Sequence, residues 1–272
     1  MRQLSDFSDD RLKGSCIHCD GSLGNGKTNR EHVPTRSLLD KPYPENLPTF
    51  DVNPECNTHF SLYEECLVAF LASVLSGSTE PDSVRFPTVA RALERNSSLR
   101  KRIDQSKRVQ GSLWGSPEIQ WTPEIERVNR VIVKNARGHA FYELGEPMLA
   151  EPSWVGVNPM SLLSPSQREV FENGTNSSPW PEVGSRLIQR VALGDVEPGG
   201  WITVQPDVYR YSVSQGFDEV LVRLVVRDYL AAEVLWGDSV SHEESEVETL
   251  LEAPSSPLRG PEVDHLTKGH RG

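Results

Sequence analysis

Arg30-Glu31-His32-Val33-Pro34 places a carboxylate and an imidazole next to each other in the chain. Hydrolysis of a phosphodiester needs a base that activates water and a divalent ion that holds the phosphate. Successive side chains on a strand point to opposite faces, and local twist can bring both near one site. One short segment could therefore supply both functions, although a lone His beside Pro is usually a turn residue.

Two asparagines follow at positions where an amide oxygen could be useful. Asn46 precedes Leu47-Pro48, and Asn57 follows Cys56 at the start of a predicted helix. An Asn at a helix entry can offer its carbonyl oxygen to a hard cation. The structural alternatives are ordinary turn chemistry for Asn46 and helix capping for Asn57.

Three cysteines have the order of a zinc site. Cys16-Ile17-His18-Cys19 is a CxxC pair, and Cys56 ends a second turn-like segment. Two thiolates at this spacing can bind one tetrahedral zinc from a tight turn. The fourth cysteine would fall at residue 53, which is Asn53. Asp51, His18 or His59 could replace it, or the site holds no zinc.

The combined order of these segments resembles the HNH endonucleases, in their cysteine-bearing branch. The matching stretches are CIHC, REHVP, ENLP and ECNTHFSLYEEC, within residues 16–67. The resemblance implies a ββα fold around one catalytic metal ion. A zinc held by the cysteines would be structural, because a closed site has no open position for a substrate.

The same resemblance implies roles for individual residues. His32 falls on the general base, Glu31 on a metal ligand, and Asn46 on the asparagine that orients the base. Asn57 falls on the second metal ligand, and Asn at this position suits Mg²⁺ or Mn²⁺ better than zinc. Glu64 lies two turns further along the helix, ~10.5 Å from Asn57 along the axis, so we expect it beside the substrate or behind the ligands.

Composition and charge bound the other possibilities. The chain has 272 residues, of which 36% are hydrophobic and 25% charged, and its net charge is −11. No stretch approaches the roughly 18–20 apolar residues of a membrane span, and residues 1–13 lack the apolar core of a secretory signal. We expect a cytoplasmic protein. The net negative charge argues against nucleic acid as a partner, but Lys and Arg gather within residues 85–108.

Hydrophobic periodicity predicts the remaining elements. A helix with one apolar face runs from Phe60 to Val74 and stops at Gly77, and Cys66 belongs to its core. A second helix is predicted over 88–107. The segment 123–144 is interpreted as a helix that runs into a strand, 153–182 as a loop, and 183–236 mainly as β-strands.

The sequence predicts an α+β protein: an N-terminal ββα-metal HNH core with zinc-ribbon-like cysteines, then helices, then a β-rich C-terminal domain. Its expected parts are a polar lead-in (1–13), the nuclease core (14–77), a basic helical segment (78–119), an α+β domain of unknown role (120–236) and an acidic disordered tail (237–272).

The expected function is metal-dependent hydrolysis of nucleic acid, with DNA favoured over RNA and a role in restriction or phage defence. The residues expected to contact phosphates are Arg95, Arg100, Lys101 and Arg102. One alternative is a catalytically idle zinc-ribbon-like module that binds nucleic acid or protein. Another is an interaction protein whose main function lies in the β-rich half, with an accessory protein or a second copy as partner.

Overall fold

The computed structural model describes Leu4 and residues 14–24, 26–110, 118–174, 181, 183–237 and 258–259. The expected lead-in therefore lies outside the described residues except for Leu4, and the expected tail does so except for Gly237 and residues 258–259. Over the described residues the fold is mixed α+β, with six α-helices and a five-stranded antiparallel sheet as its largest elements. None of these helices combines the length and the apolar character needed to cross a membrane.

Contacts divide the chain into two compact units. Unit 1 comprises Met1–Glu65 and Ile125–Ser255, and unit 2 comprises Cys66–Glu124 and Ser256–Gly272. The helix α1 (Pro54–Ser76) begins in unit 1 and continues in unit 2. The expected boundaries at residues 77 and 119 differ from this division, because the later α+β elements pack with the N-terminal segment in one unit.

The N-terminal part of unit 1 has the order strand, strand, helix. β1 (Asn29–His32) pairs antiparallel with β2 (Thr49–Val52), and α1 follows immediately. A small core beneath the hairpin contains Ile17, Leu23 and Val52 together with Phe141 of a later helix. This segment therefore has the element order strand, strand, helix.

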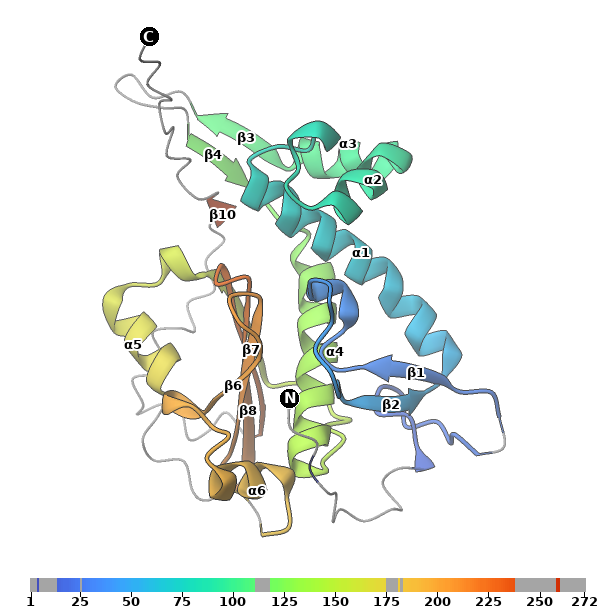
Figure 1. Cartoon of the computed structure of the whole chain (residues 1–272), viewed down its shortest axis with the longest axis vertical. Helices are drawn as coiled ribbons and strands as arrows, with labels where there is room; N and C mark the ends of the chain where they lie inside the picture. The colour runs from blue at the N-terminus through green and yellow to red at the C-terminus, as the bar shows by residue number, and fades with distance from the viewer. Residues whose placement is uncertain are drawn as a thin grey trace. The chain divides into compact units, whose positions relative to one another are not determined.

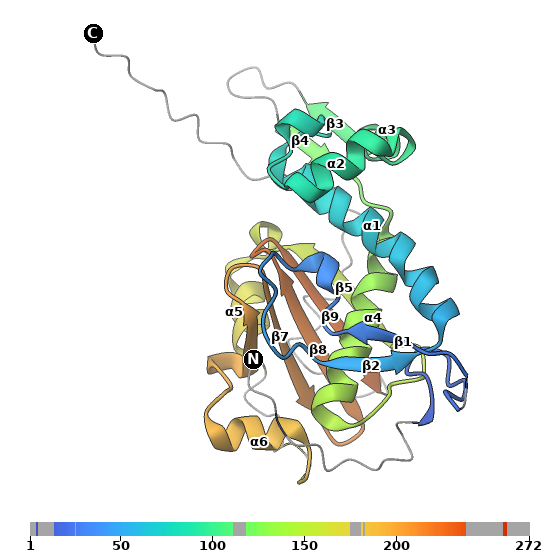
Figure 2. The same cartoon turned by 45° about the vertical axis from the view of Figure 1, so that its right-hand side comes forward.

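The larger part of unit 1 is a sheet with helices on both faces (Figures 1 and 2). The strand order is β5-β9-β8-β7-β6, and every neighbouring pair is antiparallel. The helix α4 contacts strands β7, β8 and β9 from one side. On the other side Phe171 of α5 packs with Trp201, Val225 and Ala231. The elements are β5 (Trp154–Pro159), α5 (Pro165–Asn173), α6 (Arg186–Leu193), β6 (Trp201–Gln205), β7 (Tyr209–Gln215), β8 (Glu219–Val226) and β9 (Leu230–Gly237).

The helix α4 (Ile125–Leu144) lies between the β1–β2 hairpin and the sheet (Figure 2). Phe50 of β2 meets Phe141 of α4 with ring centroids 4.9 Å apart. At Gly138 a Cβ atom would come within 2.5 Å of Val33, so only glycine permits this close approach. The expected strand at the end of this segment is wrong. The apolar run is a helix buried almost all round, which lacks the amphipathic period of a surface helix.

Two other expectations for unit 1 are also corrected. Residues 186–193 form the helix α6 rather than a strand, with Ser185 as its N-cap and Gly194 as its left-handed C-cap. The expected loop 153–182 contains β5 and α5, and Ser164 and Gln167 form a capping box at the start of α5. Capping residues therefore mark the ends of two helices, α5 and α6, that hydrophobic periodicity alone did not reveal.

Unit 2 contains the second half of α1, two short helices and a small sheet of order β10-β4-β3. The expected helix 88–107 is divided, because the Asn96 side chain accepts a hydrogen bond from Leu99 N and caps a new helix. Trp121 is fully buried, and its ring lies 6.4 Å from that of Phe70. The elements are α2 (Pro87–Arg95), α3 (Ser97–Gln105), β3 (Lys107–Gln110), β4 (Glu118–Trp121) and β10 (Leu258–Arg259).

Candidate functional site

The thiols of Cys16, Cys19 and Cys56 converge, with all three sulfur atoms within 4.8 Å of one another. A tight turn supplies the first two, since the backbone N–H groups of Cys19 and Asp20 donate to Cys16 O. Cys56 comes from the first turn of α1. Burial and the two neighbouring thiols raise the pKa of Cys56 to about 12, so the Cys56 sulfur ionises at neutral pH only when a cation stabilises it. The cluster could hold a metal such as Zn²⁺.

The fourth position of a tetrahedral site has no cysteine. Asn53 Nδ2 donates to Cys19 Sγ at 3.1 Å, and Asn53 N donates to Cys16 Sγ at 3.4 Å. None of the three suggested replacements joins the cluster, which contains only cysteines among the described residues. His18 bonds to Glu31 instead, Asp51 is exposed on β2, and His59 lies exposed against the ring of Tyr63.

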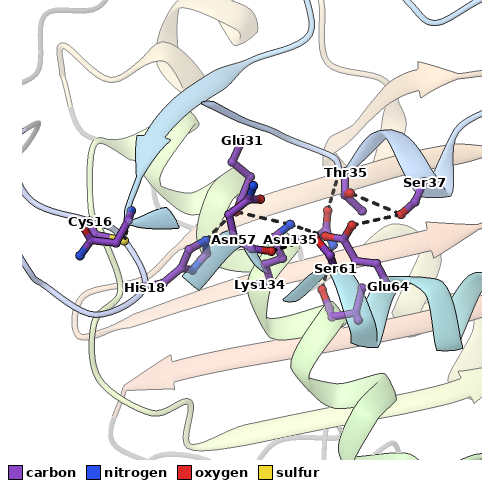
Figure 3. A network of polar contacts seen from close by, with 12 residues as sticks. Cys16, His18, Glu31, Thr35, Ser37, Asn57, Ser61, Glu64, Lys134 and Asn135 are labelled. Atoms are coloured by element: carbon purple, nitrogen blue, oxygen red, sulfur yellow. Dashed lines mark hydrogen bonds and ion pairs between the residues drawn. The ribbon is translucent and has the colours of Figure 1, made fainter. Parts of the chain in front are cut away.

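Glu31 is buried and lies between two basic side chains (Figure 3). Its Oε1 is 3.0 Å from Nε2 of His18, which stands between the two cysteines of the CxxC turn. Its Oε2 lies 3.4 Å from Nζ of Lys134 on α4 but has no hydrogen-bond partner. The turn that gathers the thiols thus also fixes the first candidate ligand of the divalent ion.

A row of polar side chains on α1 lies near Lys134, the ion-pair partner of Glu31. Asn57, Ser61 and Glu64 are spaced by about one helical turn and therefore share a face of α1. Glu64 Oε1 forms an ion pair with Lys134, and Glu64 Oε2 accepts a hydrogen bond from Ser37 at 3.4 Å. The amide of Asn57 makes no hydrogen bond within the described part of the chain. Lys134 thus joins Glu31 to Glu64, and Asn57 lies on the same face of α1 as Glu64 (Figure 3).

A hydrogen bond to α4 fixes the segment that follows β1. Thr35 N donates to Asn135 Oδ1 at 2.9 Å, and Asn135 Nδ2 donates to Val131 O at 2.8 Å. Asn135 is buried and adjacent to Lys134 on α4. Two successive residues of α4 thus anchor the β1–β2 segment, one by charge and one by hydrogen bonding.

His32 is half-buried at the end of β1, on the opposite face from Glu31. Burial lowers the pKa of His32 below its usual value, the Arg36 and Arg30 cations lower it further, and Glu31 opposes them. The imidazole is therefore neutral at pH 7, which is the form that a general base requires.

Asn46 does not orient His32 in this structure. It is exposed and has φ +60°, a left-handed conformation that Asn tolerates in turns. No hydrogen bond joins its side chain to His32 within residues 26–110. The structural role that the sequence offered as an alternative for Asn46 is the one that the backbone supports.

Lys134 and the contact of His18 with Glu31 were missed by sequence reasoning. A single lysine within the apolar run VIVKNARG was the available signal, because lysine is rarely buried without a partner. For His18 there was no comparable signal, since its place in the CxxC turn suggested zinc instead.

The basic segment of unit 2 is partly neutralised by neighbouring carboxylates. Arg100 pairs with Glu80 at 3.3 Å, and Arg102 pairs with Glu124 at 2.9 Å. Arg95 Nε donates to the backbone oxygen of Arg91 on the same helix turn. These pairs reduce the positive potential that the sequence alone suggested for this surface.

Comparison with known proteins yields no assignment. No family model matches the chain, and neither a curated protein nor a solved structure matches it. The case for a function therefore depends on the residues and their geometry.

Proposed function

We propose that this chain is a metal-dependent nuclease of the HNH kind that hydrolyses phosphodiester bonds, with DNA favoured over RNA. One observation carries the proposal: the hairpin β1–β2 and the helix α1 gather Glu31, Asn57 and Glu64 beside a cysteine cluster, with His32 adjacent. Of these residues, the sequence resemblance assigned Glu31 and Asn57 to the metal and His32 to the base, and helix spacing predicted Glu64 behind the ligands or beside the substrate. A role in restriction or phage defence agrees with this chemistry.

The chemistry of the donor atoms favours a divalent ion at Glu31. Its Oε2 is a buried carboxylate oxygen that accepts no hydrogen bond, and its ionic partner is the ammonium of Lys134 at 3.4 Å, so it retains coordination capacity for a divalent cation. This oxygen and the amide oxygen of Asn57 would hold Mg²⁺ or Mn²⁺, which take oxygen ligands. When bound, the ion stabilises negative charge on the phosphate.

The side chains of the chain perform the remaining tasks. The neutral imidazole of His32 accepts a proton from the attacking water. His18 fixes one oxygen of Glu31 and leaves the other for the ion. Asn46 has no catalytic task in this proposal because it is exposed in a turn. In unit 2, Arg95, Arg100, Lys101 and Arg102 remain proposed contacts to the phosphate backbone.

The experiment is incubation of purified protein with plasmid DNA and with single-stranded RNA, in Mg²⁺, in Mn²⁺ and with chelator. We expect cleavage that depends on the ion. His32→Ala should cleave about 10²–10⁴-fold more slowly, which is the usual contribution of a general base. His59→Ala is the matched control, because this exposed histidine lies on α1 and should retain full activity. Absence of ion-dependent cleavage, or full activity of folded His32→Ala, would contradict the proposal.

The second candidate function is a catalytically idle module that binds nucleic acid or protein. It is favoured by the engagement of Glu31 with His18 and Lys134, which gives this carboxylate a purely structural set of partners. In that case the protein would bind DNA with and without chelator and would never cleave it.

A further inference from the structure

Lys134 is a buried cation contributed to the site from outside the ββα motif. Its side chain is 3% exposed, and its Nζ lies 3.4 Å from Glu31 Oε2 and in direct contact with Glu64 Oε1. The ammonium also lies 5.5 Å from the centroid of the Phe60 ring. Three separate elements, β1, α1 and α4, therefore place their charged groups together.

Two carboxylates of this cluster share one ammonium. Lys134 Nζ is the ion-pair partner of both Glu31 Oε2 and Glu64 Oε1. Buried ionised groups are costly unless they are paired, and Glu31 Oε2 has no hydrogen bond despite its proximity to Lys134. A cluster built only for stability would have one carboxylate for one ammonium.

We propose that Lys134 is a resident cation of the active site that competes with the divalent ion for Glu31. This inference depends on the proposed function, which places the ion at Glu31. In the metal-free protein Lys134 neutralises part of the charge of the two carboxylates. With a divalent ion added, the Lys134 ammonium adds one positive charge beside the ion, and this charge attracts the negative charge of a phosphodiester. Lys134 thus weakens metal binding and strengthens phosphate binding.

The proposal predicts changes of opposite sign when the charge of Lys134 is removed. The affinity for Mn²⁺ should rise, because a repelling cation near Glu31 has gone. The affinity for DNA in the presence of Mn²⁺ should fall, because the loaded cluster loses one positive charge. A lysine that only stabilised the fold would produce neither pattern, since its loss would loosen Glu31 and weaken both affinities together.

The measurement uses full-length protein carrying His32→Ala, so that DNA is bound but not cleaved. Mn²⁺ affinity is measured from the electron paramagnetic resonance signal of the free ion, and DNA affinity from the fluorescence anisotropy of a labelled duplex. We expect Lys134→Gln to bind Mn²⁺ about tenfold more tightly and the duplex about tenfold more weakly, as a single charge at this distance can produce. Lys134→Arg should retain both original affinities, and Lys27→Gln, at an exposed position, is the control.

A second pair of variants covers the case in which Lys134→Gln does not fold. Glu64→Gln with Lys134→Met removes both members of an ion pair and is compared with Glu64→Gln alone. The double variant should bind Mn²⁺ more tightly than the single one. Unchanged or weaker Mn²⁺ binding in folded Lys134 variants would overturn the proposal.

The two proposals fail in different ways. If the protein with Lys134 cleaves DNA in Mn²⁺ but Lys134→Gln binds the ion no more tightly, only the competition is wrong. If Lys134→Gln binds Mn²⁺ more tightly while the original chain never cleaves, the competition stands and the nuclease is wrong. If no variant binds Mn²⁺, both are wrong.

Discussion

Two buried glutamates, Glu143 on α4 and Glu31 on β1 beside α4, have different surroundings. Glu143, on α4 itself, is fully buried, and Arg190 Nε lies 2.9 Å from each of its oxygens. The hydroxyl of Tyr211 donates to the same carboxylate at 2.5 Å. Glu31, near the middle of α4, has a hydrogen bond on one oxygen only. One carboxylate is satisfied by fixed partners, and the other is not.

Under the proposed function, this difference separates a structural carboxylate, Glu143, from a functional one, Glu31. Around Glu143 each neighbour has a packing role: Tyr211 stacks on His139 at 3.7 Å, and burial lowers the pKa of His139 well below its usual value, so the ring is neutral. Around Glu31 one neighbour, His18, comes from a segment that the sequence had marked as chemical, and the other, Lys134, comes from α4. A buried carboxylate with an unused oxygen is therefore a better indicator of a site than burial or charge alone.

The largest expected effect comes from disruption of the cysteine cluster. It distinguishes the two glutamates, because only Glu31 is held by a residue of the CxxC turn. Elemental analysis should find about one zinc per chain. Cys16→Ser should abolish zinc binding and unfold the region around the turn, since structural zinc contributes on the order of 10 kcal/mol of apparent folding free energy. Cleavage should then disappear, as His18 no longer holds Glu31. Thermal unfolding and circular dichroism measure the effect.

The control for the cysteine experiment is Cys66→Ser. Cys66 is buried on α1 and lies outside the thiol cluster. It should retain zinc and lose only modest stability. Zinc-free protein with an unchanged melting curve after chelation would show that the cluster is a set of ordinary buried thiols.

The next effect compares the glutamates directly. Glu143→Gln leaves Arg190 buried without its counter-charge and should cost about 3–5 kcal/mol in the free energy of unfolding. Glu31→Gln should cost only about 1 kcal/mol, because Lys134 retains Glu64 and the amide oxygen still accepts from His18. Their effects on ion-dependent cleavage should be reversed: Glu31→Gln abolishes it at low Mn²⁺, while folded Glu143→Gln retains it. Urea unfolding and plasmid cleavage measure the two quantities.

Equal losses of stability in the two variants would remove the distinction between them. So would full cleavage activity in Glu31→Gln at limiting Mn²⁺. Either result would assign Glu31 to the same structural class as Glu143 and favour the idle binding module.

The sequence predicted the local part of this architecture well. Each of the pairs Glu31-His32 and Cys16-Cys19 is local in the chain, and the order of these motifs before the helix entry at Cys56 was used to group them. The α+β class and the helix ending before Gly77 followed from the same local signals. The metal-binding capacity of Cys16, Cys19 and Cys56 is confirmed at the level of geometry.

The long-range part was not predictable from patterns of this kind. Lys134 reaches Glu64 across 70 positions of sequence, and Asp40 accepts two hydrogen bonds from Arg227 across 187. Because α4 is buried on several sides, its sequence lacks the amphipathic period that would have identified it as a helix. The sequence predicted a separate β-rich domain because no local pattern shows that the segment around Asp40 packs on the sheet.

The smallest expected effect concerns a third buried carboxylate, Glu233 of β9, which tests whether missing partners always indicate a catalytic site. Burial raises the pKa of Glu233 to about 7, and the nearby Arg223 only partly opposes this. The pKa of Glu233 is higher in the folded protein than in the unfolded chain. The contribution of its protonated carboxyl group to the free energy of unfolding is therefore fully present below about pH 4.5. This contribution is lost as the pH rises through about 7. Glu233→Gln should remove this dependence and make the protein about 2–3 kcal/mol more stable than the original chain at pH 8.

The measurement for Glu233 is the difference in unfolding free energy between the two proteins from pH 5 to pH 8. This difference cancels contributions from other groups such as Glu172, whose pKa the Arg210 guanidinium lowers. Cleavage should be unaffected, because Glu233 contacts no residue of the proposed site. A difference that stays constant with pH would mean that Arg223 keeps Glu233 ionised throughout, and a loss of cleavage would extend the active site to the far face of the sheet.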